Sequence, residues 1–106
     1  MANETQEFVI HEHTTPDGVH WDLMLQSGQQ LQTYRLDKPP QQAIHLAMNA
    51  EKIHDHPLKF LTYQGPVQKG SGTVKIIESG TYTIKHQSDS RIDLSLHSRA
   101  EQQNRY

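Results

Sequence analysis

The strongest constraint on the fold is the alternation of apolar and polar residues from Phe8 to Leu25, FVIHEHTTPDGVHWDLML. Successive side chains of a β-strand point to opposite faces of the sheet, so such alternation predicts two strands joined by a turn at residues 14–18. In the second strand the two faces hold different kinds of residue: Val19, Trp21, Leu23 and Leu25 on one, and His20, Asp22 and Met24 on the other. The apolar face requires a core, and Trp21 is expected to pack there.

The polar face of this hairpin carries a candidate metal site. His13 shares a face of the first strand with Val9 and His11, so a pairing that brings the strand ends together places His13 beside His20 and Asp22. Two imidazoles and a carboxylate are ligands that divalent metals accept. The alternative is that these are solvated strand residues. A cupin-type site beginning at His11 and His13 fits the later spacing poorly.

The core of this chain is expected to be thin. Its 106 residues suit one domain, which we place at 1–106, with residues 1–7 and 98–106 loosely ordered. Only 33% of the residues are hydrophobic, below the usual globular average. A small curved sheet or barrel can fold with so little apolar material, because only one face of each strand must be buried.

The remaining segments also favour strands. Strands are predicted at 31–36, 73–78, 81–86 and 91–97, with Ser79-Gly80 as a tight hairpin turn and Gly65-Pro66 as another turn. Residues 43–48 fit a short helix or a strand equally well. We therefore predict a mostly β fold: a small antiparallel β-barrel of about six to eight strands with at most one short helix.

Charge and composition exclude several classes of function. Ten Lys and Arg against twelve Asp and Glu, without basic clusters, argue against tight binding of duplex nucleic acid, although a single strand end could still bind. The eight histidines favour metal or phosphate chemistry. The sequence shows neither cysteine, nor an apolar leader, nor a membrane span, so we expect a cytoplasmic monomer without membrane contact.

A series of short motifs resembles a known family. The motifs follow one another in this order: His13, His20-Trp21-Asp22, Tyr34-Arg35-Leu36, Asp55-His56-Pro57-Leu58, Tyr63-Gln64-Gly65-Pro66-Val67 and Gly72-Thr73-Val74. Together, from about Phe8 to about His97, they resemble the 3′-phosphoesterase module of bacterial DNA ligase D. Their order and number make the resemblance far more specific than any one motif.

The resemblance implies a small β-barrel with a manganese-dependent activity that removes 3′-phosphate or 3′-ribonucleotide ends from nucleic acid. It further implies a role in DNA repair, with DNA-repair proteins as possible partners. The family's metal ligands carry over to His13, His20 and Asp22. Its further active-site histidine carries over to His56, which would contact the phosphate or act in catalysis; a cap held by the turn before Pro57 is the structural alternative.

Two positions depart from the family. Met24 stands where the family has an arginine, and Phe60 where it has a tyrosine, and both missing groups would contact phosphate. Arg35 or Tyr63 could supply a substitute. The alternative function is therefore a catalytically weakened module that binds a metal or a nucleic-acid end, and a third is a purely structural domain. The family's closing strand also has no counterpart here, which predicts an incompletely closed barrel or a chain that is cut short.

Overall fold

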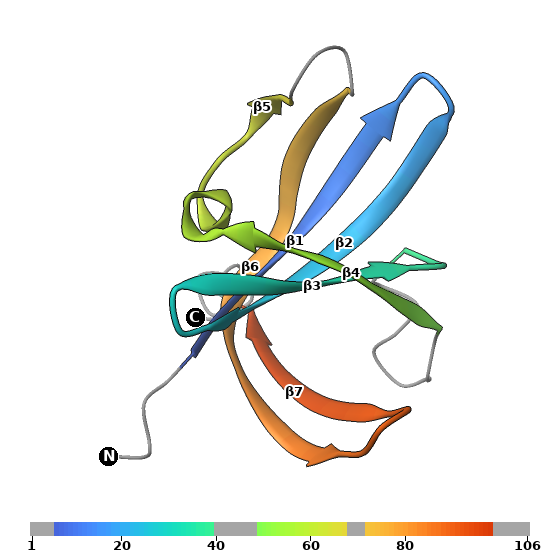
Figure 1. The fold of residues 1–106 in the computed structure, drawn as a ribbon. Helices are drawn as coiled ribbons and strands as arrows, with labels where there is room; N and C mark the ends of the chain where they lie inside the picture. Colours follow the sequence, from blue (N-terminus) through green and yellow to red (C-terminus); the bar gives the residue numbers. More distant parts are fainter. Residues whose placement is uncertain (1–5, 40–48, 68–71, 99–106) are drawn as a thin grey trace, which may run out of the picture.

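The chain folds into one curled antiparallel sheet, a half-barrel, shown in Figure 1. This computed structural model describes residues 6–39, 49–67 and 72–98. The strands are β1 (Gln6–Thr15), β2 (Gly18–Ser27), β3 (Gln30–Leu36), β4 (Ala50–Pro57), β5 (Gly65–Pro66), β6 (Thr73–Gln87) and β7 (Ile92–Ser98), and one 3₁₀ helix, η2, spans Leu58–Leu61. The prediction of a mostly β, antiparallel fold is confirmed.

The sheet has the strand order β4-β3-β2-β1-β6-β5, and β7 also pairs with β6. Figure 1 shows β6 as a long curved strand, with β5 beside one part and β7 beside the other. In the parts of the chain that the structure describes, no helix is long and apolar enough to cross a membrane.

The predicted hairpin of β1 and β2 is confirmed. The two strands pair in a register that sets His13 opposite His20 and His11 opposite Asp22. Its turn is stabilised by Thr15, whose hydroxyl donates to the carbonyl of Gly18 and accepts from the amide of Asp17, both over 3.1 Å. These two cross-strand pairs therefore lie on one face of the sheet.

Apolar residues are buried on both faces of this sheet. The main cluster continues the apolar face of the hairpin and comprises Phe8, Ile10, Leu23, Leu25, Leu36 and Tyr82, with Trp21 packed against it. A second, smaller cluster of Val9, Met24 and Leu31 lies on the opposite face, where Phe60 and its neighbours in η2 cover it. The second cluster thus occupies the face that carries His13, His20 and Asp22.

The predicted tight turn at Ser79-Gly80 is wrong, because both residues lie inside the single strand β6. A two-residue hairpin turn needs positive φ, and Gly80 is not among the glycines that adopt it. Gly80 instead pairs with Phe8 of β1 on one side and with Ser98 of β7 on the other. Pairing with two neighbours at once keeps the backbone extended through this position.

Three further boundaries differ from the prediction. Gly65-Pro66 forms the short strand β5 against Val74 and Thr73 rather than a free turn. Gln6, Glu7 and Ser98, expected in loosely ordered ends, belong to β1 and β7. The segment 43–48, for which a helix and a strand remained open, lies outside the described residues.

A glycine is required at position 72, just before β6 begins, because the backbone there passes close to the end of β1. Gly72 has a φ of 104°, and a Cβ atom there would lie 2.0 Å from the carbonyl oxygen of Thr14. Gly72→Ala is therefore expected to destabilise the fold by at least about 2 kcal/mol, combining backbone strain with a steric clash. Gly28→Ala is the matched control, since Gly28 also has positive φ (63°) but open space around it. Urea unfolding measures both; equal losses would show that the contact with Thr14 contributes nothing.

Candidate metal centre

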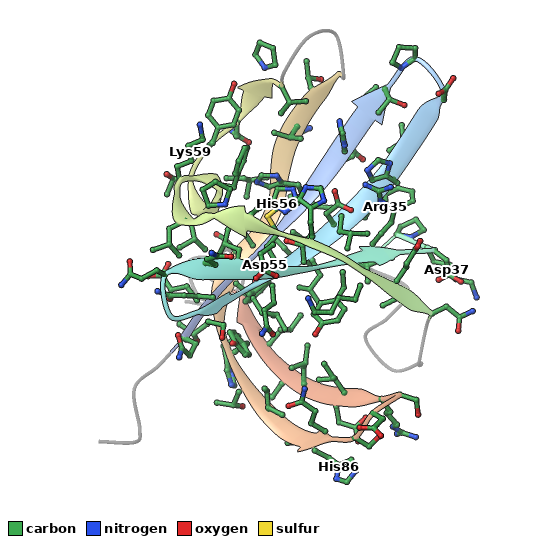
Figure 2. All side chains as sticks on the ribbon, viewed as in Figure 1. Arg35, Asp37, Asp55, His56, Lys59 and His86 are labelled. Carbon is green, nitrogen blue, oxygen red and sulfur yellow. The ribbon has the colours of Figure 1, made fainter. Side chains whose placement is uncertain are left out.

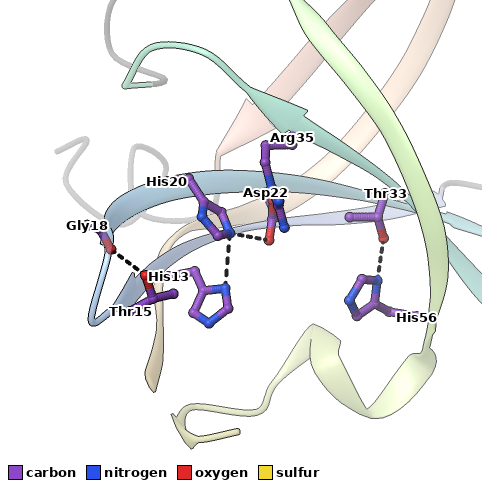
Figure 3. A network of polar contacts seen from close by, with 8 residues as sticks. All are labelled: His13, Thr15, Gly18, His20, Asp22, Thr33, Arg35 and His56. Atoms are coloured by element: carbon purple, nitrogen blue, oxygen red, sulfur yellow. Dashed lines mark hydrogen bonds and ion pairs between the residues drawn. The ribbon is translucent and has the colours of Figure 1, made fainter. Parts of the chain in front are cut away.

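Three side chains of the β1–β2 hairpin form a compact cluster of metal-ligating groups. One ligand atom each from His13, His20 and Asp22 lies within 4.8 Å of the others. His13 Nδ1 and His20 Nε2 are 3.0 Å apart, and His20 Nε2 is 3.4 Å from Asp22 Oδ2. Figure 3 shows the three side chains converging on one side of the sheet. The structure thus brings together all three residues predicted as metal ligands.

The spacing of these donors fits a divalent cation. Ligand atoms about 2.1 Å from an ion lie about 3.0 Å apart at a right angle and about 3.4 Å apart at the tetrahedral angle. The contacts His13–His20 and His20–Asp22 have these separations, while all three donors lie within 4.8 Å of one another, so a small movement of the side chains would close the set around one ion. Burial lowers the pKa of His20, against the opposing effect of the Asp22 carboxylate, and so favours the neutral imidazole that a metal requires.

Asp22 is the buried anchor of the cluster. It is 4% exposed, yet its carboxylate contacts a basic group on each side: His20 at Oδ2 and Arg35 at Oδ1, where Arg35 Nε donates over 3.2 Å. Arg35 reaches it because β3 pairs with β2 in a register that sets these two residues opposite each other. A buried carboxylate held on both sides keeps its orientation, which a metal ligand needs.

His56 lies near this cluster but comes from β4, the edge strand. Its Nδ1 is 2.8 Å from the hydroxyl of the buried Thr33, and Figure 3 shows its ring on the same side of the sheet as His13 and His20. Burial lowers the pKa of His56, the neighbouring His54 lowers it further, and the charge of Asp22 opposes both effects. A neutral His56 can accept a proton near pH 7.

His11 is a fully buried imidazole beneath η2. Its Nε2 donates to the carbonyl of Phe60 over 3.0 Å, and among the described residues its Nδ1 has no hydrogen-bond partner. Burial lowers the pKa of His11, so the ring is neutral at pH 7. This hydrogen bond ties η2 to β1 and holds Phe60 beside the site.

The two positions that depart from the family pattern share one apolar region. Met24 is 2% exposed in the small cluster with Val9 and Leu31, and Phe60 packs against that cluster. The Phe60 ring also meets His56 edge-on, with centroids 5.6 Å apart. The sequence pattern placed Met24 on the face of Asp22, which is confirmed; its burial under η2 was not foreseen.

The two residues considered as substitutes occupy different positions. Arg35 contacts Asp22 directly and is 40% exposed, so its guanidinium borders both the cluster and solvent. Tyr63 lies beyond Phe60, and its hydroxyl donates to the carbonyl of Pro66. That bond would have to break before the Tyr63 hydroxyl could donate to a phosphate oxygen.

An open groove adjoins the cluster. It has a volume of about 450 Å³ and runs from His20 and Arg35 past Trp21 to Asp37 and Asn49. Its size is in the range of small-molecule sites.

Sequence reasoning missed two of the polar residues around this site. Thr33 looked like an ordinary strand residue, because its contact with His56 depends on the pairing of β3 with β4. His11 was considered only as part of a different metal motif, although its place between Val9 and His13 on one face was a usable signal.

Comparison with known proteins identifies the family of the chain. No curated protein matches the chain. The family model for the DNA ligase D 3′-phosphoesterase domain matches residues 11–105, which includes His13, His20, Asp22 and His56. A match over nearly the whole chain shows that this protein belongs to the DNA ligase D 3′-phosphoesterase domain family.

Proposed function

We propose that the protein is a divalent-metal-dependent phosphoesterase that removes phosphate or a ribonucleotide from the 3′ ends of nucleic acid in DNA repair. The observation that carries the proposal is the convergence of the His13, His20 and Asp22 donors within 4.8 Å, with His56 on the same side of the sheet. Family membership supports the reaction class. The open groove beside the cluster is lined by His20 and Arg35, but not by His13, Asp22 or His56, so the proposal rests on the cluster and not on the groove.

Each side chain has a distinct part in this proposal. His13, His20 and Asp22 would hold the cation, with Mn²⁺ as the proposed metal. When bound, a cation there supplies a Lewis acid that neutralises charge on the phosphoryl oxygens. Arg35 holds Asp22 in place and offers further N–H donors to an anion. His56 would contact the phosphate or exchange a proton at its ring nitrogen.

The scattered charge of the chain limits how substrate is recognised. A net charge of −2, with basic residues scattered along the sequence, argues against tight binding of a long duplex, so recognition would be confined to the strand end. Binding is then expected to depend only weakly on salt, because few phosphates are neutralised.

The direct test is phosphate release from an oligonucleotide with a 3′-phosphate. We expect inorganic phosphate to appear with Mn²⁺ and not with a chelator, since the guanidinium of Arg35 is already paired with Asp22 and does not replace a cation held by the three ligands. An otherwise identical oligonucleotide with a 5′-phosphate is the substrate control, and one ending in a 3′-ribonucleotide tests the second reaction. Turnover no faster than that of a His20→Ala protein would refute the enzymatic function.

A second function is favoured by the burial of Met24 and the packing of Phe60. Met24 belongs to one apolar cluster and Phe60 packs against it, at positions where the family has groups that bind phosphate. We therefore propose, as the alternative, a catalytically weakened module that binds a metal or a nucleic-acid end. In that case end-labelled DNA binds in the presence of Mn²⁺ and is recovered unprocessed.

A further inference from the structure

Thr33 connects β3 to the histidine proposed to act on substrate. Its side chain is completely buried, and its hydroxyl makes two contacts: 3.1 Å to the carbonyl oxygen of Leu31 and 2.8 Å to Nδ1 of His56. The pairing of β3 with β4 is irregular at this point, between Leu31 and Thr33. The Thr33 hydroxyl has a single proton, so it can donate a hydrogen bond to only one of these two atoms and must accept one from the other.

Only one assignment of protons satisfies these contacts. A carbonyl oxygen accepts hydrogen bonds and never donates, so the Thr33 hydroxyl proton goes to Leu31. The Thr33 oxygen is then the acceptor toward His56, and Nδ1 of His56 must carry the proton. In the neutral ring, Nε2 is left with its lone pair.

We propose that Thr33 is a positioning residue that holds His56 as the Nδ1–H tautomer, so that Nε2 is the nitrogen presented to substrate. The inference rests on the proposed function in one respect, the role of His56 at the phosphate. Free histidine favours the opposite tautomer, with the proton on Nε2. The Nδ1–H tautomer assigns His56 the role of a proton acceptor at Nε2, and without Thr33 a proton on Nε2 would prevent that role.

The same contact helps to orient the ring. His56 stands on an exposed edge strand, where its strand neighbours His54 and Asp55 are exposed. Phe60 meets the ring edge-on, and the ring of His54 stacks against it with centroids 4.7 Å apart. The backbone of His54 also hydrogen-bonds the imidazole, while the Thr33 hydroxyl lies 2.8 Å from Nδ1. Thr33 therefore shares the orientation of the ring with His54 and Phe60, and its hydroxyl places the proton on Nδ1.

The first experiment measures the tautomer directly by ¹⁵N NMR of the imidazole nitrogens, in metal-free protein at pH 8. We expect His56 of the wild type to show a protonated Nδ1 and an unprotonated Nε2. Thr33→Ser, which keeps the hydroxyl, should give the same pattern. Thr33→Val, which has the same shape without the hydroxyl, should move the proton to Nε2. A wild-type His56 with its proton on Nε2 overturns the inference, with no variant needed.

The second experiment follows phosphate release by the same three proteins. We expect Thr33→Val to lower kcat about 10-fold to 100-fold with little change in KM, which is part of the about 10²-fold to 10⁴-fold contribution of a positioned general acid or base. Thr33→Ser should restore most of kcat. Equal kcat in Thr33→Val and wild type contradicts the positioning role.

The two experiments separate this inference from the proposed reaction. If no tested end is hydrolysed but the tautomer depends on the Thr33 hydroxyl as expected, the reaction is wrong and the control of His56 by Thr33 stands. If phosphate is released but wild-type His56 is the Nε2–H tautomer, the reaction stands and the inference fails.

Discussion

Replacing His20 with alanine is expected to weaken Mn²⁺ binding by at least about 100-fold and to abolish Mn²⁺-dependent phosphate release. His20 is the central member of the cluster, since its Nε2 contacts both His13 and Asp22. Loss of an outer partner of a metal ligand already costs about 10-fold to 100-fold in affinity, so loss of a ligand itself should cost more. Calorimetric titration with Mn²⁺ measures the affinity.

The matched control is His86→Ala. His86 is exposed on the part of β6 that pairs with β7, and Figure 2 shows it far from Arg35 and His56. The substitution His86→Ala removes one of the eight histidines and leaves His13, His20 and Asp22 unchanged. We expect Mn²⁺ affinity to be unchanged in His86→Ala. Equal affinities in His20→Ala and the wild type would show that the three side chains are an ordinary polar network without a metal.

The parts of the fold that could be predicted are those specified by local sequence. Alternation and a short turn are enough to define the β1–β2 hairpin, and its register then places His13 opposite His20. The candidate cluster follows from the same local pattern, which explains why all three of its members are found together.

The parts that could not be predicted depend on strand pairing over long distances. β4 is an exposed edge strand in which Ile53 is the only half-buried apolar residue, so it lacks the alternation that marks a strand. Ser79-Gly80 has the composition of a hairpin turn, but pairing with both β1 and β7 overrides that local preference. The contact of Thr33 with His56 arises only when β3 and β4 pair.

Met24 illustrates the same limit at the site itself. Strand alternation places it correctly on the face of Asp22, yet alternation cannot show what covers that face. The cover is η2, a single turn of 3₁₀ helix whose Phe60 is tied to β1 through His11. A position that looked available to bind phosphate is therefore part of an apolar core.

Met24→Arg is expected to destabilise the protein by about 3–5 kcal/mol, a large share of the stability of a small domain. The side chain is 2% exposed and surrounded by Val9, Leu31 and the apolar residues of η2, so a guanidinium placed there is a buried charge. The nearest carboxylate on this face, Asp22, is already paired with Arg35 and His20. Chemical unfolding measures the loss, with Met24→Leu as the control of similar volume, expected to cost less than about 1.5 kcal/mol.

The double variant Met24→Arg/Phe60→Tyr separates packing from chemistry. Phe60 is only half-buried, so a hydroxyl on its ring costs little by itself, but it cannot neutralise a guanidinium. We therefore expect the double variant to remain as unstable as Met24→Arg and to release phosphate no faster than the wild type. The opposite result, a stable double variant with faster release, would mean that the arginine displaces η2 and reaches the phosphate. The apolar cluster would then be a replaceable cover over an intact phosphate site, and the weakened-module function would gain its strongest support.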